Sequence, residues 1–80
     1  MTVTILLFAV YRELADTASL DLELPADATV RDAMDRLRSL PGLGCLPAEP
    51  TVAVNREYSS LGRDLKPGDE IALIPAVAGG

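Results

Sequence analysis

The last two residues of the sequence, Gly79 and Gly80, form the segment with the clearest chemical potential. Because glycine has no Cβ, this dipeptide can adopt backbone conformations closed to other residues and can enter a channel too narrow for a side chain. An α-carboxyl group ionises with a pKa of about 3.5, so at neutral pH it is a poor electrophile that must be activated before a nucleophile can attack it. Adenylation by a separate ATP-dependent enzyme is the usual route. We therefore expect the Gly80 carboxylate to be the functional group, with a frayed, inert terminus as the alternative.

The composition excludes the commoner kinds of active site. The chain has no histidine and no tryptophan, and Cys45 is its only cysteine. It lacks the residues most often used for a zinc site or a nucleophile–base pair, so we expect no metal and no cofactor bound by this chain. Cys45 is flanked by Gly44 and a leucine, which offer no basic group to activate a thiol. We expect it to be a small buried hydrophobe rather than a persulfide acceptor.

Charge and hydropathy limit the classes of partner that the chain can have and the compartment in which we expect it. Twelve acidic and seven basic residues give a net charge of −5, which argues against a nucleic-acid partner. The apolar run from Val3 to Tyr11 is interrupted by Thr4 and has no basic leader, so it indicates a strand rather than a signal peptide or a membrane span. A single cysteine allows no internal disulfide, as is typical of a reducing compartment. We expect a cytoplasmic protein with no membrane partner.

Local patterns predict five strands and one main helix. Apolar stretches bounded by turn residues are typical of strands, and Tyr11 to Leu14 suits a turn or a single helical turn. Thr29 is expected to cap the helix together with Asp32, and Pro41-Gly42 to end it. The predicted strands are Thr2–Phe8, Leu20–Leu24, Thr51–Val54, Glu57–Ser59 and Glu70–Pro75, and the predicted helix is Val30–Leu40.

This order predicts an α+β fold, in which one main helix crosses a mixed sheet and the first and last strands are adjacent in its middle. The chain is long enough for one small domain, which we place at residues 1–75, followed by a flexible tail at 76–80. Leu43 to Pro50 is expected to form a connecting loop. The expected core between helix and sheet consists of Val3, Ile5, Leu7, Leu22, Met34, Leu37, Ile71 and Leu73.

One helix covers only one face of a sheet, and the other face is also expected to be apolar. Side chains of a strand alternate between faces, so Leu6 and Phe8 should share the second face with Ala72 and Ile74 of the last strand. Tyr58 on the short edge strand is expected to join them in a docking surface. The alternative is that the loop at Leu43–Pro50 covers this face. Arg12 is either a partner contact or half of a solvated ion pair with Glu13.

Four motifs, in order and at matching spacing, give the chain a resemblance to a known family. They are Leu7-Phe8-Ala9 followed by Arg12-Glu13-Leu14, then Val52-Ala53-Val54-Asn55, then Leu65-Lys66-Pro67-Gly68-Asp69-Glu70-Ile71-Ala72, and finally Pro75 to Gly80. The sequence resembles the ubiquitin-like β-grasp sulfur carriers of the MoaD/ThiS family, and within them the small subunits of molybdopterin synthase. The resemblance spans nearly the whole chain.

The resemblance implies a mechanism. An E1-like enzyme would adenylate the Gly80 carboxylate with ATP, and a sulfur donor would convert it to a thiocarboxylate. Val77, Ala78 and Gly79 would thread Gly80 into a pocket of the large synthase subunit, within a heterotetramer. There the thiocarboxylate would give its sulfur to cyclic pyranopterin monophosphate in molybdenum cofactor biosynthesis. Acid and base groups would come from the large subunit, and the interface would include Leu6, Phe8, Arg12, Tyr58 and Ile74.

The tail departs from the synthase pattern and leaves other functions open. Pro75-Ala76-Val77-Ala78 stands where those subunits more often have two prolines and a hydroxyl residue. Carriers that serve cysteine, thiamine or tRNA thiolation therefore remain alternatives. A second class also remains, a non-catalytic β-grasp adaptor that docks by its sheet without chemistry at its terminus.

Overall fold

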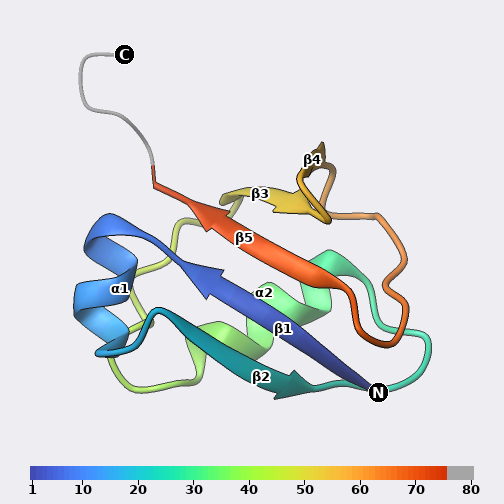
Figure 1. The fold of residues 1–80 in the computed structure, drawn as a ribbon, viewed down its shortest axis with the longest axis horizontal. Helices are drawn as coiled ribbons and strands as arrows, with labels where there is room; N and C mark the ends of the chain where they lie inside the picture. Colours follow the sequence, from blue (N-terminus) through green and yellow to red (C-terminus); the bar gives the residue numbers. More distant parts are fainter. Residues whose placement is uncertain (76–80) are drawn as a thin grey trace.

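A computed structural model describes residues 1–75, and the predicted tail lies outside this range. Seven elements follow one another along the chain (Figure 1). They are β1 (Thr2–Leu7), α1 (Ala9–Ala15), β2 (Ser19–Glu23), α2 (Val30–Arg38), β3 (Thr51–Val54), β4 (Glu57–Ser59) and β5 (Glu70–Ile74). Neither helix is long and apolar enough to cross a membrane within the described residues.

The strands form one mixed sheet in the order β2-β1-β5-β3-β4. The first and last strands, β1 and β5, run parallel in its middle, and every other neighbouring pair is antiparallel. β1 and β2 pair as in a hairpin, but α1 lies in the connection between them. The predicted central position of the first and last strands is therefore confirmed.

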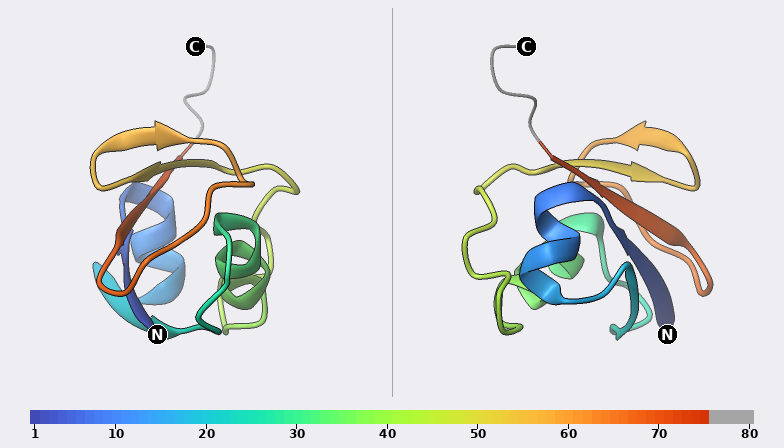
Figure 2. Two further views of the ribbon diagram at one scale, coloured as in Figure 1. Left: turned by 90° about the vertical axis from the view of Figure 1, so that its right-hand side faces the viewer. Right: turned by 60° about the vertical axis from the view of Figure 1, so that its left-hand side comes forward.

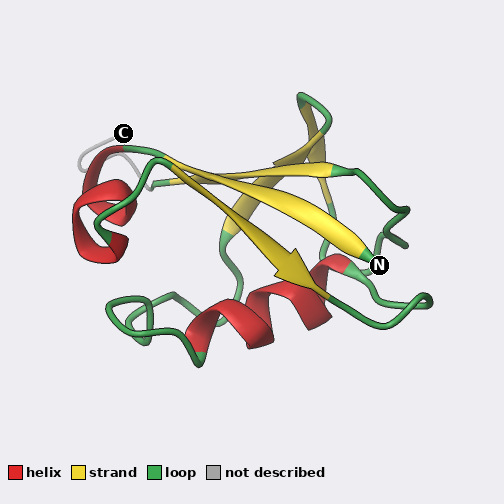
Figure 3. Cartoon of the chain, turned by 60° about the horizontal axis from the view of Figure 1, so that its bottom comes forward, coloured by secondary structure: helices red, strands yellow, loops and turns green. Residues whose placement is uncertain are grey.

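The two helices lie on the same side of the sheet. Figure 3 shows α2 passing below the sheet, and Figure 2 shows α1 at one end of β1, away from the middle of α2. The sequence pattern predicted a turn or a single helical turn at Tyr11–Leu14, and the structure has a longer helix there, because seven residues are too short to show a clear helical period. The α+β architecture with one main helix crossing a mixed sheet is confirmed.

α2 begins at a reciprocal cap that the sequence predicted. The Asp32 backbone N–H donates to Thr29 Oγ1 at 3.4 Å, and the Asp32 carboxylate accepts from the Thr29 backbone N–H at 2.8 Å. This capping box satisfies two N–H groups that a helix start leaves free. α2 ends at Arg38 rather than Leu40, and its buried side chains are Val30, Ala33, Met34 and Leu37.

The predicted core is confirmed. All eight of its residues are at most 4% exposed, so sheet and helix share one apolar interior. The loop after α2 contributes Leu43 and Leu46 to that interior, which the sequence did not predict. Between these two leucines Cys45 is exposed, so the expectation of a buried cysteine was wrong. The inward positions of this loop belong to the leucines, and Cys45 points outward.

The loop after α2 is held on the helix side of the molecule. The Arg38 guanidinium donates to the backbone carbonyl of Ala48 at 3.1 Å and to that of Pro47, and it pairs with Asp35 at 2.7 Å. Together with the burial of Leu43, these contacts keep the loop away from the second face of the sheet. The alternative that this loop covers that face is therefore wrong.

Two turns meet at the end of the sheet where β5 begins. The side chain of Asn55 donates to the Asp69 carboxylate at 2.9 Å and accepts from the Glu70 backbone N–H at 3.0 Å. The same carboxylate accepts from the Lys66 backbone N–H at 2.8 Å. These bonds tie the β3–β4 turn to the turn that feeds β5, and so fix the register at which β5 enters the sheet.

Gly42 lies where the loop after α2 passes close to the backbone of α1. Its φ is +85°, and a Cβ there would lie 2.1 Å from the Leu14 carbonyl oxygen. Gly68 has nearly the same φ, +82°, with no atom within 4 Å of a Cβ position. We expect Gly68→Ala to cost about 1–2 kcal/mol for the left-handed backbone alone, and Gly42→Ala to cost clearly more. Urea unfolding of both variants checks this, and equal losses would mean that the Leu14 contact is not tight.

Asp69 should make stability depend on acid pH. Burial acts to raise the pKa of its carboxyl, but the Lys66 N–H, the Asn55 amide and the charges of Arg63 and Lys66 outweigh burial and lower it. An unfolded aspartate has a pKa of about 3.9, so this contribution is complete above that pH and is lost as pH falls through the lower folded value. Wild type should therefore exceed Asp69→Asn in unfolding free energy near neutral pH, with a margin that narrows below about pH 4. A margin independent of pH in urea titrations would contradict this.

Candidate interaction face

The second face of the sheet is left uncovered by the described residues. α2 and the loop after it pack on the opposite face, and in Figure 1 the viewer looks at the uncovered face with α2 behind it. We call this surface the open face. Its members follow from the strand register, because residues opposite one another in neighbouring strands point to the same side.

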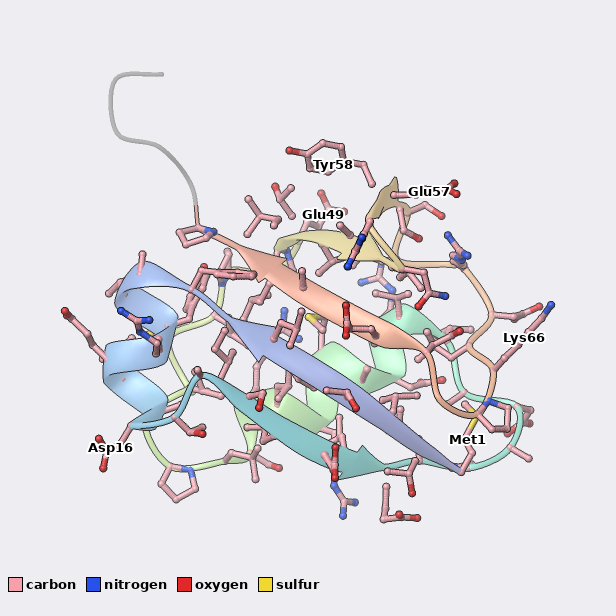
Figure 4. The ribbon with its side chains drawn as sticks, in the orientation of Figure 1. Met1, Asp16, Glu49, Glu57, Tyr58 and Lys66 are labelled. Atoms are coloured by element: carbon pink, nitrogen blue, oxygen red, sulfur yellow. The ribbon has the colours of Figure 1, made fainter. Side chains whose placement is uncertain are left out.

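One continuous apolar row crosses the open face. Leu6 lies opposite Ala72, Ala72 lies opposite Ala53, and Ala53 lies opposite Tyr58. Leu6 and Ala72 are half-buried by their neighbours, and Tyr58 is 78% exposed. In Figure 4 the Tyr58 ring stands at the upper edge of the sheet, with its hydroxyl turned toward the side where β5 ends. The row therefore runs from a flat centre to a projecting aromatic edge.

A second apolar pair lies at the end of β5. Ile74 is half-buried opposite Thr51 of β3. Phe8 follows β1 with an extended backbone, so alternation places it on the same side as Leu6, and its side chain is 47% exposed. β1 and β5 are parallel neighbours, so Phe8 and Ile74 lie at the same end of the sheet. The structure thus brings together four of the five predicted interface residues, namely Leu6, Phe8, Tyr58 and Ile74.

The fifth predicted interface residue, Arg12, lies on α1 rather than on the sheet. It is exposed, and the ion pair with Glu13 does not form within the described part of the chain. α1 follows directly after Phe8, so Arg12 is at the end of the molecule where β5 also ends. α1 also presents two exposed apolar side chains, Val10 and Leu14, which the sequence pattern did not predict although their spacing of four is a helical signal.

The chain leaves the sheet from its centre. Pro75 follows Ile74, and because proline has no N–H it cannot extend the ladder of β5. The predicted functional residues Val77, Ala78, Gly79 and Gly80 lie outside the described residues. Pro75 lies at the end of the sheet where Phe8 and Ile74 also lie. A partner that docks on the open face is therefore adjacent to Pro75.

The described residues offer no enclosed site for a small substrate. They form no pocket and no cluster of side chains suited to a metal ion, and no buried polar side-chain atom among residues 1–75 lacks a partner. What this part of the molecule can provide is a docking surface and a fixed starting point for the residues that follow.

Comparison with known proteins identifies the family. The family model described as the ThiS family matches residues 5–80. The chain belongs to the ThiS family. Among its relatives, the molybdopterin synthase sulfur carrier subunit of Drosophila melanogaster is 36% identical, with 100% of this chain and 92% of the relative covered. Small archaeal modifier protein 1 of Haloferax volcanii is 37% identical over 92% of this chain and 95% of its own length.

Solved structures place this ThiS-family chain among ubiquitin-like β-grasp proteins. The crystal structure of SAMP1 from Haloferax volcanii has a TM-score of 0.84 at 32% identity, with all of both chains covered. One chain of the complex of subunits 1 and 2 of molybdopterin-converting factor from Helicobacter pylori has a TM-score of 0.71 at 25% identity, also over all of both chains. The predicted β-grasp fold is confirmed.

Proposed function

We propose that this chain is the sulfur-carrier subunit of a molybdopterin synthase and that the carboxylate of Gly80 carries the sulfur. The observation that supports this best is the full-length similarity to proteins named molybdopterin synthase sulfur carrier subunits, with a family match that includes Gly80. The described fold agrees with the proposal, because it provides a docking face and no pocket of its own.

The chemistry needs two activation steps outside this chain. The Gly80 carboxylate attacks the α-phosphorus of ATP on an E1-like enzyme, pyrophosphate leaves, and an acyl-adenylate forms. A sulfide-level donor then attacks the carbonyl carbon and AMP leaves, which gives a thiocarboxylate. Its sulfur is a softer and stronger nucleophile than the original oxygen. This sulfur attacks a carbon of cyclic pyranopterin monophosphate and displaces an oxygen substituent from that carbon, which gives a thioester. Hydrolysis of the acyl–sulfur bond then leaves the sulfur on the substrate and restores the carboxylate.

The open face is the proposed docking surface for the large synthase subunit. Apolar side chains flanked by a projecting aromatic residue are the composition favoured at interface centres. The end of β5 lies at the border of this surface, so docking brings the residues after Pro75 to the partner without further rearrangement of the sheet. The resemblance to synthase subunits implies that the large subunit supplies the acid and base groups. The resemblance to synthase subunits supports a heterotetramer.

A protein-modifier function is the second candidate, because a similar archaeal protein is named as a modifier. It shares the adenylation step and diverges afterwards, since an amine rather than a sulfur donor attacks the carbonyl carbon and an amide forms as AMP leaves. The products separate the two functions. A modifier leaves higher-mass conjugates that resist reducing agents, whereas a sulfur carrier remains a single chain.

The proposed function requires Gly80 at the very end of the chain. Deleting Gly80, replacing it by alanine, or adding one residue after it should abolish sulfur transfer in an assay with the large subunit, the activating enzyme, ATP and a sulfur source. The unfolding free energy should change by less than about 0.5 kcal/mol, since terminal residues make few native contacts. Gly62→Ala is the matched control, because a Cβ at Gly62 meets no atom within 4 Å. Wild-type transfer by the Gly80 deletion would falsify the carrier proposal.

The docking surface is tested by charges placed on the open face. Phe8→Asp and Ile74→Lys should leave a folded monomer and weaken association with the large subunit by at least about 2 kcal/mol if each position is a hot spot. Ala26→Asp and Ala48→Lys introduce the same charges at exposed positions off the sheet and should bind as wild type does. Titration calorimetry measures both pairs. Unchanged affinity of the two face variants would place the interface elsewhere.

A further inference from the structure

The five strands carry acidic side chains but no basic ones. All seven lysine and arginine residues of the chain lie outside the strands, in the two helices, the turns and the loops. The strands contain four carboxylates, at Asp21, Glu23, Glu57 and Glu70. Glu57 is opposite the buried Val54 and so belongs to the other side of the sheet. The remaining three share the open face.

These three carboxylates are grouped at one end of that face. Thr4 lies between Asp21 of β2 and Glu70 of β5, and Thr2 lies opposite Glu23. Asp21 and Glu23 are exposed, and Glu70 is half-buried. We call Asp21, Glu23 and Glu70 the acidic half of the open face. Glu70 comes two residues before Ala72 in β5, so the acidic half begins about 7 Å from the apolar row that contains Ala72.

Hydroxyl groups hold two of the carboxylates in place, and no cationic group of residues 1–75 forms a salt bridge with any of the three. Thr4 Oγ1 donates to Asp21 Oδ1 at 3.1 Å, and Thr2 Oγ1 donates to the Glu23 carboxylate. The one salt bridge within residues 1–75 is between Asp35 and Arg38, on the side of α2. The acidic half therefore presents ordered negative charge that a partner cation can neutralise.

The apolar part of the open face is at the opposite end, where β5 ends and the chain continues. In Figure 4, Met1 marks the end of the sheet where β1 begins, and Tyr58 stands at the upper edge of the sheet. The face is thus divided along the direction of β5, with the acidic half at its start and apolar side chains at its end. Such a face can match a complementary surface in only one orientation.

We propose that the acidic half orients the large synthase subunit on the open face by pairing with basic side chains. The inference rests on the proposed function and names the chemistry of the partner surface. That surface has an apolar patch beside its pocket and lysine or arginine residues on the side away from the pocket. In this orientation the end of β5 faces the pocket. In the reversed orientation the carboxylates lie against the apolar patch of the partner and have no cation to pair with. Unpaired charges at an interface lower its affinity.

Paired charges of this kind act mainly on the rate of association. Complementary potentials speed diffusional encounter, and salt weakens this effect because the screening length falls to about 8 Å at physiological ionic strength. Neutralising the acidic half should therefore slow association at low salt and flatten its salt dependence. Dissociation should change less, since the apolar contacts remain.

The test compares two double variants that remove the same charge. Asp21→Asn with Glu23→Gln keeps the oxygen atoms that accept from Thr4 and Thr2, and Asp16→Asn with Asp27→Asn removes two exposed carboxylates off the sheet. Stopped-flow association with the large subunit is measured from low to physiological salt, after thermal unfolding has verified both folds. We expect the face variant to associate at least about threefold more slowly at low salt and the control variant to stay within about twofold of wild type.

Each outcome bears on a distinct claim. Equal slowing of both variants would assign the effect to net charge and overturn the orienting role of the acidic half, and so would wild-type association by the face variant. If wild type itself does not bind the large subunit, the proposed function fails and this inference fails with it. A selective loss in the face variant that disappears at high salt supports the proposal.

Discussion

The parallel pairing of β1 with β5 is the constraint on which the rest of the structure depends. Leu7 lies opposite Leu73 and Ile5 opposite Ile71, all fully or almost fully buried, so the two central strands are fixed on the core at the same time. Because parallel neighbours end at the same end of a sheet, the chain leaves β5 beside the start of α1. The exit therefore belongs to the best-anchored strand rather than to an edge, where pairing on one side only would permit fraying.

The open face follows from the same arrangement. One helix and its following loop cover one side, and Arg38 and Leu43 keep that loop in place, so the second side of the central strands remains available. A protein that presents its own terminus to a partner needs no pocket. It needs a surface that fixes the partner's position relative to the exit, and here that surface changes from acidic to apolar along β5. Under the proposed function, one end of β5 orients the partner and the other end delivers the residues after Pro75.

Local patterns were sufficient for much of this fold. The capping pair at Thr29 and Asp32 and the alternation in β1 depend on neighbours in sequence, and both were predicted. For α1 the sequence predicted no more than a turn or a single helical turn, because the burial of Tyr11 that extends the helix is a tertiary contact. It did not predict the outward position of Cys45, which depends on the burial of Leu43 and Leu46. The sequence also did not predict the acidic half, because Asp21 and Glu70 come to one face only through the pairing of both their strands with β1. The functional residues after Pro75 were proposed from their chemistry and remain a prediction.

The most direct test of sulfur carriage is the intact mass of the protein after incubation with the activating enzyme, ATP and a sulfur source. Sulfur carriage predicts a gain equal to the exchange of one oxygen for one sulfur, located in the C-terminal peptide by fragmentation and absent when ATP is withheld. An unchanged mass, under conditions in which the same enzyme converts another carrier, would contradict the account and favour an adaptor that only docks. A mass increase located at any residue other than Gly80 would contradict it as well.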